Sequence, residues 1–244
     1  MAAAGLHPVV AVYSSFLQRA YDQILHDVCL PQLPVLFAVD RAGLVGEDGP
    51  THQGIFDLSY LSTMPHMTIL APKDEGELRD MLFAAHAHPG PVALRYPRGR
   101  GQGVVLAKEA QPIPWGKAEQ LCAGQDVAIF ACGSMVYPAL AAAEQLRMEG
   151  VQAAVLNARF IKPLDAETML ALGRQAGRVL TVEENSKSGG FGSACQTLFA
   201  LEAVKVENLA LPDKFVEQGK RAEILAKYGL DAAGIAAKVR EMLQ

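Results

Sequence analysis

Short apolar runs alternate along the chain with longer segments in which apolar residues recur at helical spacing. In the first hundred residues this pattern predicts strands at 8–13, 34–40, 67–72 and 91–97, with helices at 14–30 and 74–88. Asp74 and Glu77 stand three apart at the start of the second helix, as in a capping box. Nearly continuous apolar strands separated by helices indicate a parallel sheet covered on both faces.

The alternation lapses between residues 99 and 125, where Gly and Pro accumulate, and then resumes. Further strands are predicted at 126–133, 152–160, 178–185 and 205–211, and helices at 135–150, 165–177, 192–203 and 230–244. We therefore expect an α/β protein with two open, mostly parallel sheets. The predicted division is a first domain at 1–104, a linker at 105–124 and a second domain at 125–244.

The composition narrows the class of protein. Half of the residues are hydrophobic, a fifth are charged and the net charge is -4, so no basic surface for nucleic acid is expected. No apolar run has the length of a membrane span, and no membrane partner is expected. The four cysteines form no CxxC pair and the first residues lack a basic signal region, which favours a cytoplasmic protein with free thiols.

The loop "VGEDGPTHQGIFDLSYL" at 45–61 carries the densest group of candidate site residues. It follows a predicted strand, and ligands in open parallel sheets bind beyond the carboxyl ends of strands. Asp48 and His52 can exchange hydrogen bonds with hydroxyl groups or act as acid and base. The alternative is that the acidic residues only cap the next turn, but Gly and Pro shape a turn without needing an imidazole.

Three arginines also stand at the ends of predicted strands. Arg41, Arg95 and Arg98 would together suit a phosphate or carboxylate, whereas each of them singly is more typical of a surface salt bridge. At the first strand-to-helix junction, Phe16 and Arg19 share a helix face. The pattern leaves open whether Phe16 is core or a platform for a flat ring.

Two further features argue against other kinds of site. Gly189, Gly190 and Gly192 form a GGxG turn rather than a full dinucleotide fingerprint, so a structural role is expected there. No group of His, Cys, Asp and Glu has the spacing of a metal site, and none is predicted.

Taken together, these segments resemble one family. The stretches "VAVYSSFLQRAYDQILHDV", "VLFAVDRAGLVGEDGPTHQGIFDLSYL", "ALRYPRG", "ARFIKPLD" and "TVEENSKSGGFGS" are similar to the C-terminal portion of the 1-deoxy-D-xylulose-5-phosphate synthases, which are transketolase-like and depend on thiamine diphosphate. The resemblance covers nearly the whole chain. It implies an incomplete pyrimidine-binding domain followed by a transketolase C-terminal domain.

The resemblance implies a reaction and a set of roles. Family members condense pyruvate with glyceraldehyde 3-phosphate, release carbon dioxide and supply isoprenoid, thiamine and pyridoxal phosphate synthesis. By motif match Phe16 would stack on the cofactor's pyrimidine ring and Arg19 would support it. Tyr13, Arg41 and Arg98 would bind the substrate phosphate, and Asp48 and His52 would contact the acceptor near the reacting carbon.

The chain also departs from the family pattern. Family members are more than twice as long, hold the cofactor diphosphate and Mg²⁺ through a preceding domain, and carry a catalytic glutamate upstream of the matched start. We therefore expect a fragment that is inactive alone, that works with an N-terminal part and as a homodimer, and whose first sheet has an unpaired edge and lower stability. Two alternatives are the β subunit of a 2-oxo-acid dehydrogenase, which fits "RYPRG" poorly, and a non-catalytic remnant that only dimerises.

Overall fold

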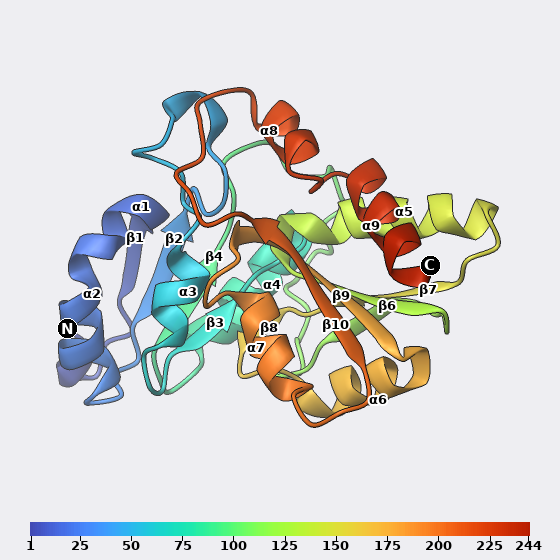
Figure 1. Cartoon of the computed structure of the whole chain (residues 1–244). Coiled ribbons are helices and arrows are strands. Elements are labelled where there is room, and N and C mark those ends of the chain that lie inside the picture. Colours follow the sequence, from blue (N-terminus) through green and yellow to red (C-terminus); the bar gives the residue numbers. More distant parts are fainter.

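The computed structural model describes all residues from 1 to 244 and contains two five-stranded sheets (Figure 1). The first sheet has the order β1-β2-β4-β3-β8, and the second has the order β10-β9-β6-β7-β5. The strands of the first sheet are β1 (Val9–Tyr13), β2 (Leu36–Asp40), β3 (Thr68–Leu70), β4 (Val92–Arg95) and β8 (Phe160–Lys162). The strands of the second are β5 (Glu119–Cys122), β6 (Val127–Ala131), β7 (Ala153–Asn157), β9 (Arg178–Ser186) and β10 (Lys205–Leu211).

Most neighbouring strands run parallel, as the apolar runs predict. Only β8 beside β3 and β5 beside β7 are antiparallel. The predicted two-sheet α/β class is therefore confirmed. Strand β5 lies inside the predicted linker, and β8, which the predicted strands do not include, leaves the second half of the chain to complete the first sheet.

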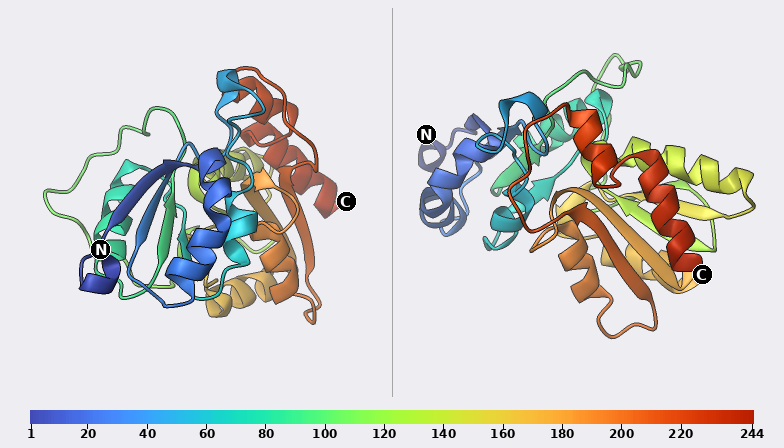
Figure 2. Two further views of the ribbon diagram at one scale, coloured as in Figure 1. Left: turned by 90° about the vertical axis from the view of Figure 1, so that its left-hand side faces the viewer. Right: turned by 45° about the horizontal axis from the view of Figure 1, so that its top comes forward.

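Helices cover both faces of the second sheet (Figure 2). Helices α5 (Val136–Met148) and α9 (Ala232–Leu243) pack together on one face, and α6 (Ala166–Ala176) and α7 (Phe191–Leu198) lie on the other. Asp165 and Asp231 cap α6 and α9 by accepting hydrogen bonds from backbone N–H groups of the first turn. These caps start the two helices where the apolar stripe begins.

The first sheet has helices on both sides as well. Helix α4 (Glu75–His86) covers one face over a small core of apolar residues, and its N-cap Asp74 accepts from the backbone N–H of Glu77 at 2.8 Å, as predicted. The remaining helices of this half are α1 (Ser14–Leu17), α2 (Tyr21–Gln23) and α3 (Asp57–Ser62), with 3-10 turns η1 (Ala2–Ala4), η2 (Gln18–Ala20) and η4 (Gly46–Asp48) and a π-helical turn η3 (Ile24–Cys29). The predicted helix at 14–30 is thus a succession of short turns of different pitch.

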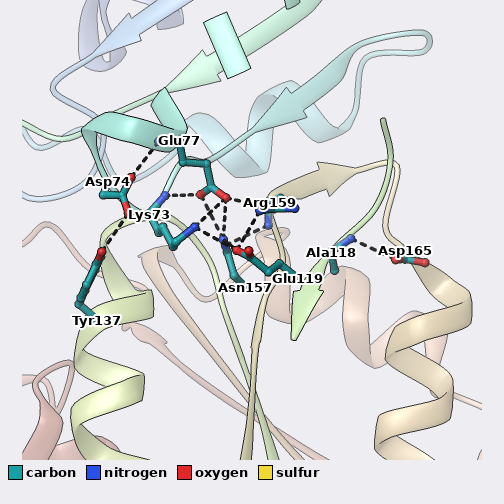
Figure 3. A network of polar contacts seen from close by, with 9 residues as sticks. All are labelled: Lys73, Asp74, Glu77, Ala118, Glu119, Tyr137, Asn157, Arg159 and Asp165. Carbon is teal, nitrogen blue, oxygen red and sulfur yellow. Dashed lines mark hydrogen bonds and ion pairs between the residues drawn. The ribbon is translucent and has the colours of Figure 1, made fainter. Parts of the chain in front are cut away.

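A buried polar cluster joins the two sheets (Figure 3). Glu77 of α4 accepts hydrogen bonds from Asn157 Nδ2 at 2.9 Å, from Arg159 Nε at 2.7 Å and from Lys73 Nζ at 3.2 Å. Glu119 of β5 accepts from the same Lys73 Nζ at 3.0 Å and pairs with Arg159 at 2.9 Å. Two carboxylates and two cations therefore balance one another between the halves of the chain.

Strand β1 is the outer edge of the first sheet. It pairs with β2 on one side only, and Val9 and Val10 are 51% and 40% exposed. An apolar strand with unpaired N–H and C=O groups is a template for further pairing. The expectation of an unpaired edge in the first sheet is met at this strand.

No helix is long and apolar enough to cross a membrane. The remaining elements are the 3-10 turn η5 (Gly133–Met135), which leads from β6 into α5, and helix α8 (Arg221–Lys227). The chain before α8 runs beside the loop of residues 41–54, and Figure 1 shows the two at the top of the molecule. This loop follows β2 and holds most of the candidate site.

Candidate functional site

The candidate residues gather at the carboxyl ends of β1, β2 and β4. Tyr13 ends β1, Arg41 directly follows β2 and Arg98 lies three residues beyond β4. The three strands are neighbours and parallel, so these ends meet at one edge of the sheet. The parallel topology therefore brings side chains that are far apart in sequence to one edge of the sheet, as predicted.

Asp48 links two of the arginines. Its Oδ2 atom accepts a hydrogen bond from Arg41 Nη1 at 2.7 Å and one from Arg98 Nη1 at 2.8 Å. All three side chains are partly exposed. A single carboxylate oxygen thus holds two guanidinium groups close together at the surface, although the two cations repel each other.

Arg41 also stands over an aromatic ring. Its Cζ atom lies 4.0 Å from the centroid of Tyr13, which is the geometry of a cation–π contact. Arg41 has a positive φ of 55°, a left-handed conformation that costs a residue with a side chain about 1 kcal/mol or more. The next residue fixes this turn, because Ala42 N–H donates to the carbonyl of Tyr96 at 3.0 Å.

An aromatic row continues from Tyr13. The Tyr13 and Phe16 ring centroids lie 5.2 Å apart, and Phe16 and His52 lie 5.6 Å apart in an edge-to-face arrangement. Phe16 is 44% exposed, so it is not a core residue. Phe16, His52 and Arg19 line the same open hollow of about 580 Å³, together with Phe56 and Phe215. Phe215 belongs to the second half of the chain and was not a candidate from the sequence.

Arg41 lines a second hollow. It has a volume of about 450 Å³ and lies between the ends of β2 and β4 and the start of α4. Arg41, Arg98, Lys73 and Arg100 are among its lining residues. The arrangement can hold an anionic group near the arginines while a flat ring rests on Phe16 in the first hollow.

The structure does not place Arg95 with the other two arginines. Arg95 is buried and donates from Nε to Asp57 Oδ2 at 2.6 Å and from Nη2 to Asp57 Oδ1 at 3.2 Å. The interpretation of three converging arginines is therefore wrong for this one. Arg95 faces the core because β4 is covered on both faces, and its charge is neutralised by a carboxylate that the sequence does not mark.

The Gly-rich turn at 189–192 has the structural role expected for it. Glu183 accepts hydrogen bonds from the backbone N–H groups of Phe191 and Gly192, at 2.7 and 2.8 Å. A Cβ atom at Gly190 would lie 2.2 Å from Glu183 Oε2, so only glycine lets the backbone come this close. Burial raises the pKa of the Glu183 carboxyl to about 7.

The neighbouring Glu184 is also buried but serves the loop of residues 41–54. Its Oε1 atom accepts from the backbone N–H of Leu44 at 2.8 Å. Sequence reasoning missed this residue, although a signal was present: two consecutive acidic residues in an otherwise apolar strand cannot both face solvent. No group of three or more His, Cys, Asp or Glu side chains is placed to hold a metal ion.

Comparisons with known proteins agree with this architecture. Residues 1–102 match the transketolase pyrimidine binding domain, and residues 116–235 match the transketolase C-terminal domain. The chain is 56% identical over 246 residues to 1-deoxy-D-xylulose-5-phosphate synthase 1 of Geobacter sulfurreducens, covering 100% of this chain and 39% of that protein. It is 55% identical over 246 residues to the 1-deoxy-D-xylulose-5-phosphate synthase of Syntrophus aciditrophicus, covering 100% and 38%.

A solved structure has the same fold. It is described as a split gene transketolase, inactive beta4 tetramer, and it superimposes with a TM-score of 0.89 at 32% identity. The match covers 99% of this chain and 78% of that one. The chain thus spans about four fifths of this solved transketolase chain, but only about two fifths of the length of the synthases that it matches.

Proposed function

This chain belongs to the transketolase family, and from that premise we propose that it forms the pyrimidine-binding and C-terminal part of a 1-deoxy-D-xylulose-5-phosphate synthase. The reaction joins pyruvate to glyceraldehyde 3-phosphate and yields 1-deoxy-D-xylulose 5-phosphate and carbon dioxide. Under this proposal residues 1–104 are the partial pyrimidine-binding domain, 105–124 the linker and 125–244 the C-terminal domain. The observation that carries it is the Asp48-linked pair of arginines beside the exposed Phe16.

The arginine pair supports a phosphate-bearing substrate. Arg41 and Arg98 present two guanidinium groups that are already close, so little reorganisation is needed to bind a dianion. Tyr13 keeps the Arg41 side chain in place through its ring. We assign these three residues to the phosphate of glyceraldehyde 3-phosphate.

Phe16 and Arg19 support the cofactor. An aromatic ring that is nearly half exposed beside an open hollow suits the face of a pyrimidine, and the residues present therefore fit that half of thiamine diphosphate. When bound, the cofactor supplies the carbon that takes up the two-carbon unit of pyruvate. The chain's own part is to hold the ring on Phe16 and to keep Arg19 at the rim of the hollow.

His52 ends the aromatic row, and Asp48, in the same loop, links the arginine pair. His52 contacts Phe16 edge-on and exchanges a hydrogen bond with Thr51 Oγ1 at 2.9 Å through Nδ1. Its other nitrogen can meet a hydroxyl or carbonyl oxygen of the acceptor. We assign Asp48 and His52 to the polar groups of the acceptor near the reacting carbon.

The remaining parts of the active site are proposed to lie outside these 244 residues. Residues 1–244 offer no acidic cluster that fits Mg²⁺, so the cofactor's diphosphate and its magnesium are assigned to the part of the fold that the synthases have beyond the matched region. We propose that this polypeptide alone does not turn over, that it acts in the cytoplasm, and that the assembled enzyme is a homodimer.

Calorimetric titration with thiamine diphosphate and Mg²⁺ tests the proposal. The chain is titrated alone and after mixing with the N-terminal part of the Geobacter sulfurreducens synthase, and synthase turnover is measured in parallel. Cofactor binding and turnover only in the mixture are expected. Turnover by the chain alone would contradict the assignment of the diphosphate site, and no binding in the mixture would contradict the cofactor assignment and favour a non-catalytic dimerising protein.

A second candidate is the β subunit of a 2-oxo-acid dehydrogenase, which carries the same two domains. The arginine pair argues against it, because an oxo-acid without a phosphate needs one guanidinium rather than two. Glyceraldehyde 3-phosphate protecting the chain against thermal unfolding, where pyruvate does not, would separate the two candidates in favour of the synthase.

A further inference from the structure

The back of the 41–54 loop is held by the second half of the chain. Gln218 Nε2 donates to the carbonyl of Glu47 at 2.7 Å, and Gln53 Nε2 donates to the carbonyl of Glu217 at 3.2 Å. Gly219 N–H donates to the carbonyl of Gly46 at 3.3 Å. Through these contacts the loop is attached to the second half of the chain, which also contributes Phe215 to the hollow beside Phe16.

Glu184 is the charged centre of this attachment, and its side chain is only 1% exposed. One carboxylate oxygen accepts from Leu44 N–H at 2.8 Å and from Arg221 Nε at 2.9 Å. The other accepts from Ser134 Oγ at 2.6 Å and also pairs with Arg221 Nη2. The buried carboxylate therefore binds the loop backbone, the turn η5 and the start of α8 at the same time.

Two glycines of the loop lie in close contact with the second half of the chain. A Cβ atom at Gly43 would lie 2.6 Å from Glu184 Cδ, and one at Gly46 would lie 2.8 Å from the carbonyl oxygen of Gly219. Both glycines have positive φ values, 85° and 72°, which other residues adopt only with strain. Gly43 thus lets the loop backbone approach Glu184, and Gly46 lets it approach Gly219.

The position of Asp48 follows from this attachment. Asp48 lies four residues beyond Leu44, in the turn η4 whose carbonyls at Gly46 and Glu47 are held by Gly219 and Gln218. Its carboxylate alone links Arg41 to Arg98. A shift of the loop backbone would move Asp48 and separate the two guanidinium groups that it brings together.

We propose that Glu184 is a positioning residue of the phosphate subsite: through Leu44 and Arg221 it sets the 41–54 loop so that Asp48 holds Arg41 and Arg98 at the separation that a phosphate requires. This inference rests on the proposed synthase function. The C-terminal half of the chain would then contribute to the affinity for the phosphorylated substrate, although the side chains of Arg41 and Arg98 hydrogen-bond only to Asp48. A misplacement of about 1 Å in such a support can change activity by about a hundredfold.

The test replaces Glu184 by glutamine in the assembled enzyme of this chain and the N-terminal part of a relative. The Gln amide has the same size, but its NH₂ group would face donors of Arg221 or Leu44, so the loop loses one of its anchors. The matched control is Glu202→Gln, because Glu202 makes a similar two-oxygen pair with Arg174 at 2.8 and 2.7 Å on the surface. Arg221→Gln serves as a second variant if Glu184→Gln does not fold, since the Arg221 side chain is partly exposed.

We expect the KM for glyceraldehyde 3-phosphate to rise at least tenfold in Glu184→Gln, the KM for pyruvate to stay within twofold, and Glu202→Gln to match wild type. Amide hydrogen exchange in residues 41–54 should quicken in the same variant. An unchanged KM for glyceraldehyde 3-phosphate, or an equal loss for both substrates, would overturn the positioning role. A wild-type assembly without any turnover would overturn the proposed function and this role with it.

Discussion

The polar cluster between the two sheets gives the sharpest stability prediction. Glu77 has 2% of its side chain exposed and accepts from Lys73, Asn157 and Arg159, while Glu119 balances the second cation. Glu77→Gln removes one of two negative charges and leaves two partly buried cations with one carboxylate. Breaking a buried ion pair by removing one partner typically costs about 3–5 kcal/mol.

Part of the lost free energy comes from the weakened contact between the two halves of the chain. Arg159 stands just before β8, the strand that crosses into the first sheet, and its guanidinium is held by Glu77 together with Glu119. We therefore expect Glu77→Gln to lower the free energy of unfolding by about 3 kcal/mol and to make the two halves unfold in separate steps.

Urea unfolding followed by circular dichroism and by Trp fluorescence measures both effects. The lone Trp115 lies against Phe160 of β8, so its fluorescence reports on the crossing strand. The control is Glu144→Gln, since Glu144 pairs with Arg147 at an exposed position and such pairs are worth about 0–1 kcal/mol. A loss below about 1 kcal/mol in Glu77→Gln, or coincident transitions by both probes, would refute the reasoning.

Four further outcomes are expected. Arg98→Gln should raise the KM for glyceraldehyde 3-phosphate about tenfold with pyruvate unaffected, because a charged hydrogen bond to phosphate is worth about 1.5–3 kcal/mol; an unchanged KM in steady-state assays would remove Arg98 from the subsite. Phe16→Ala should weaken thiamine diphosphate binding to the assembled enzyme about tenfold in calorimetry through lost stacking, and equal affinity would show that the ring rests elsewhere. Burial raises the pKa of the Glu183 carboxyl to about 7 in the folded chain, so the neutral carboxyl contributes fully to the free energy of unfolding below its ordinary pKa, and this free energy falls by about 3 kcal/mol as the pH rises to 7. Urea unfolding midpoints measured from pH 4.5 to 7.5 should show this decrease in wild type but not in Glu183→Gln, and the same decrease in both would contradict it. Limited proteolysis should cut residues 1–100 before the second half, because β1 is an unpaired edge, and the reverse order by mass spectrometry would count against that.

The positions of most candidate residues followed from local signals. Tyr13, Arg41 and Arg98 come at or just beyond the ends of apolar runs, and parallel pairing brings such ends to one edge of a sheet. Asp48 and His52 lie in a segment whose glycines predict a turn. For these residues the spacing along the chain was enough to predict that they lie near one another.

The buried charges could not be assigned in the same way. Arg95 looked equivalent to Arg98 in "RYPRG", yet one is buried against Asp57 and the other is at the surface. Glu184 and Arg221, which support the 41–54 loop, are 37 residues apart in sequence. Whether a charged side chain at a strand end turns to the core or to the solvent depends on whether a partner from another segment is there to neutralise it.

The sequence by itself determined the α/β class, the parallel strands, the helix cap at Asp74 and the glycines that permit the 41–54 loop, because each depends on the intrinsic geometry of a few neighbouring residues. The tertiary structure alone decided that β8 leaves the second half to complete the first sheet, that Glu77 joins the halves, and that Glu184 supports the loop. These features rest on contacts between segments many residues apart, and their free energy comes from burial that exists only after the sheets have packed.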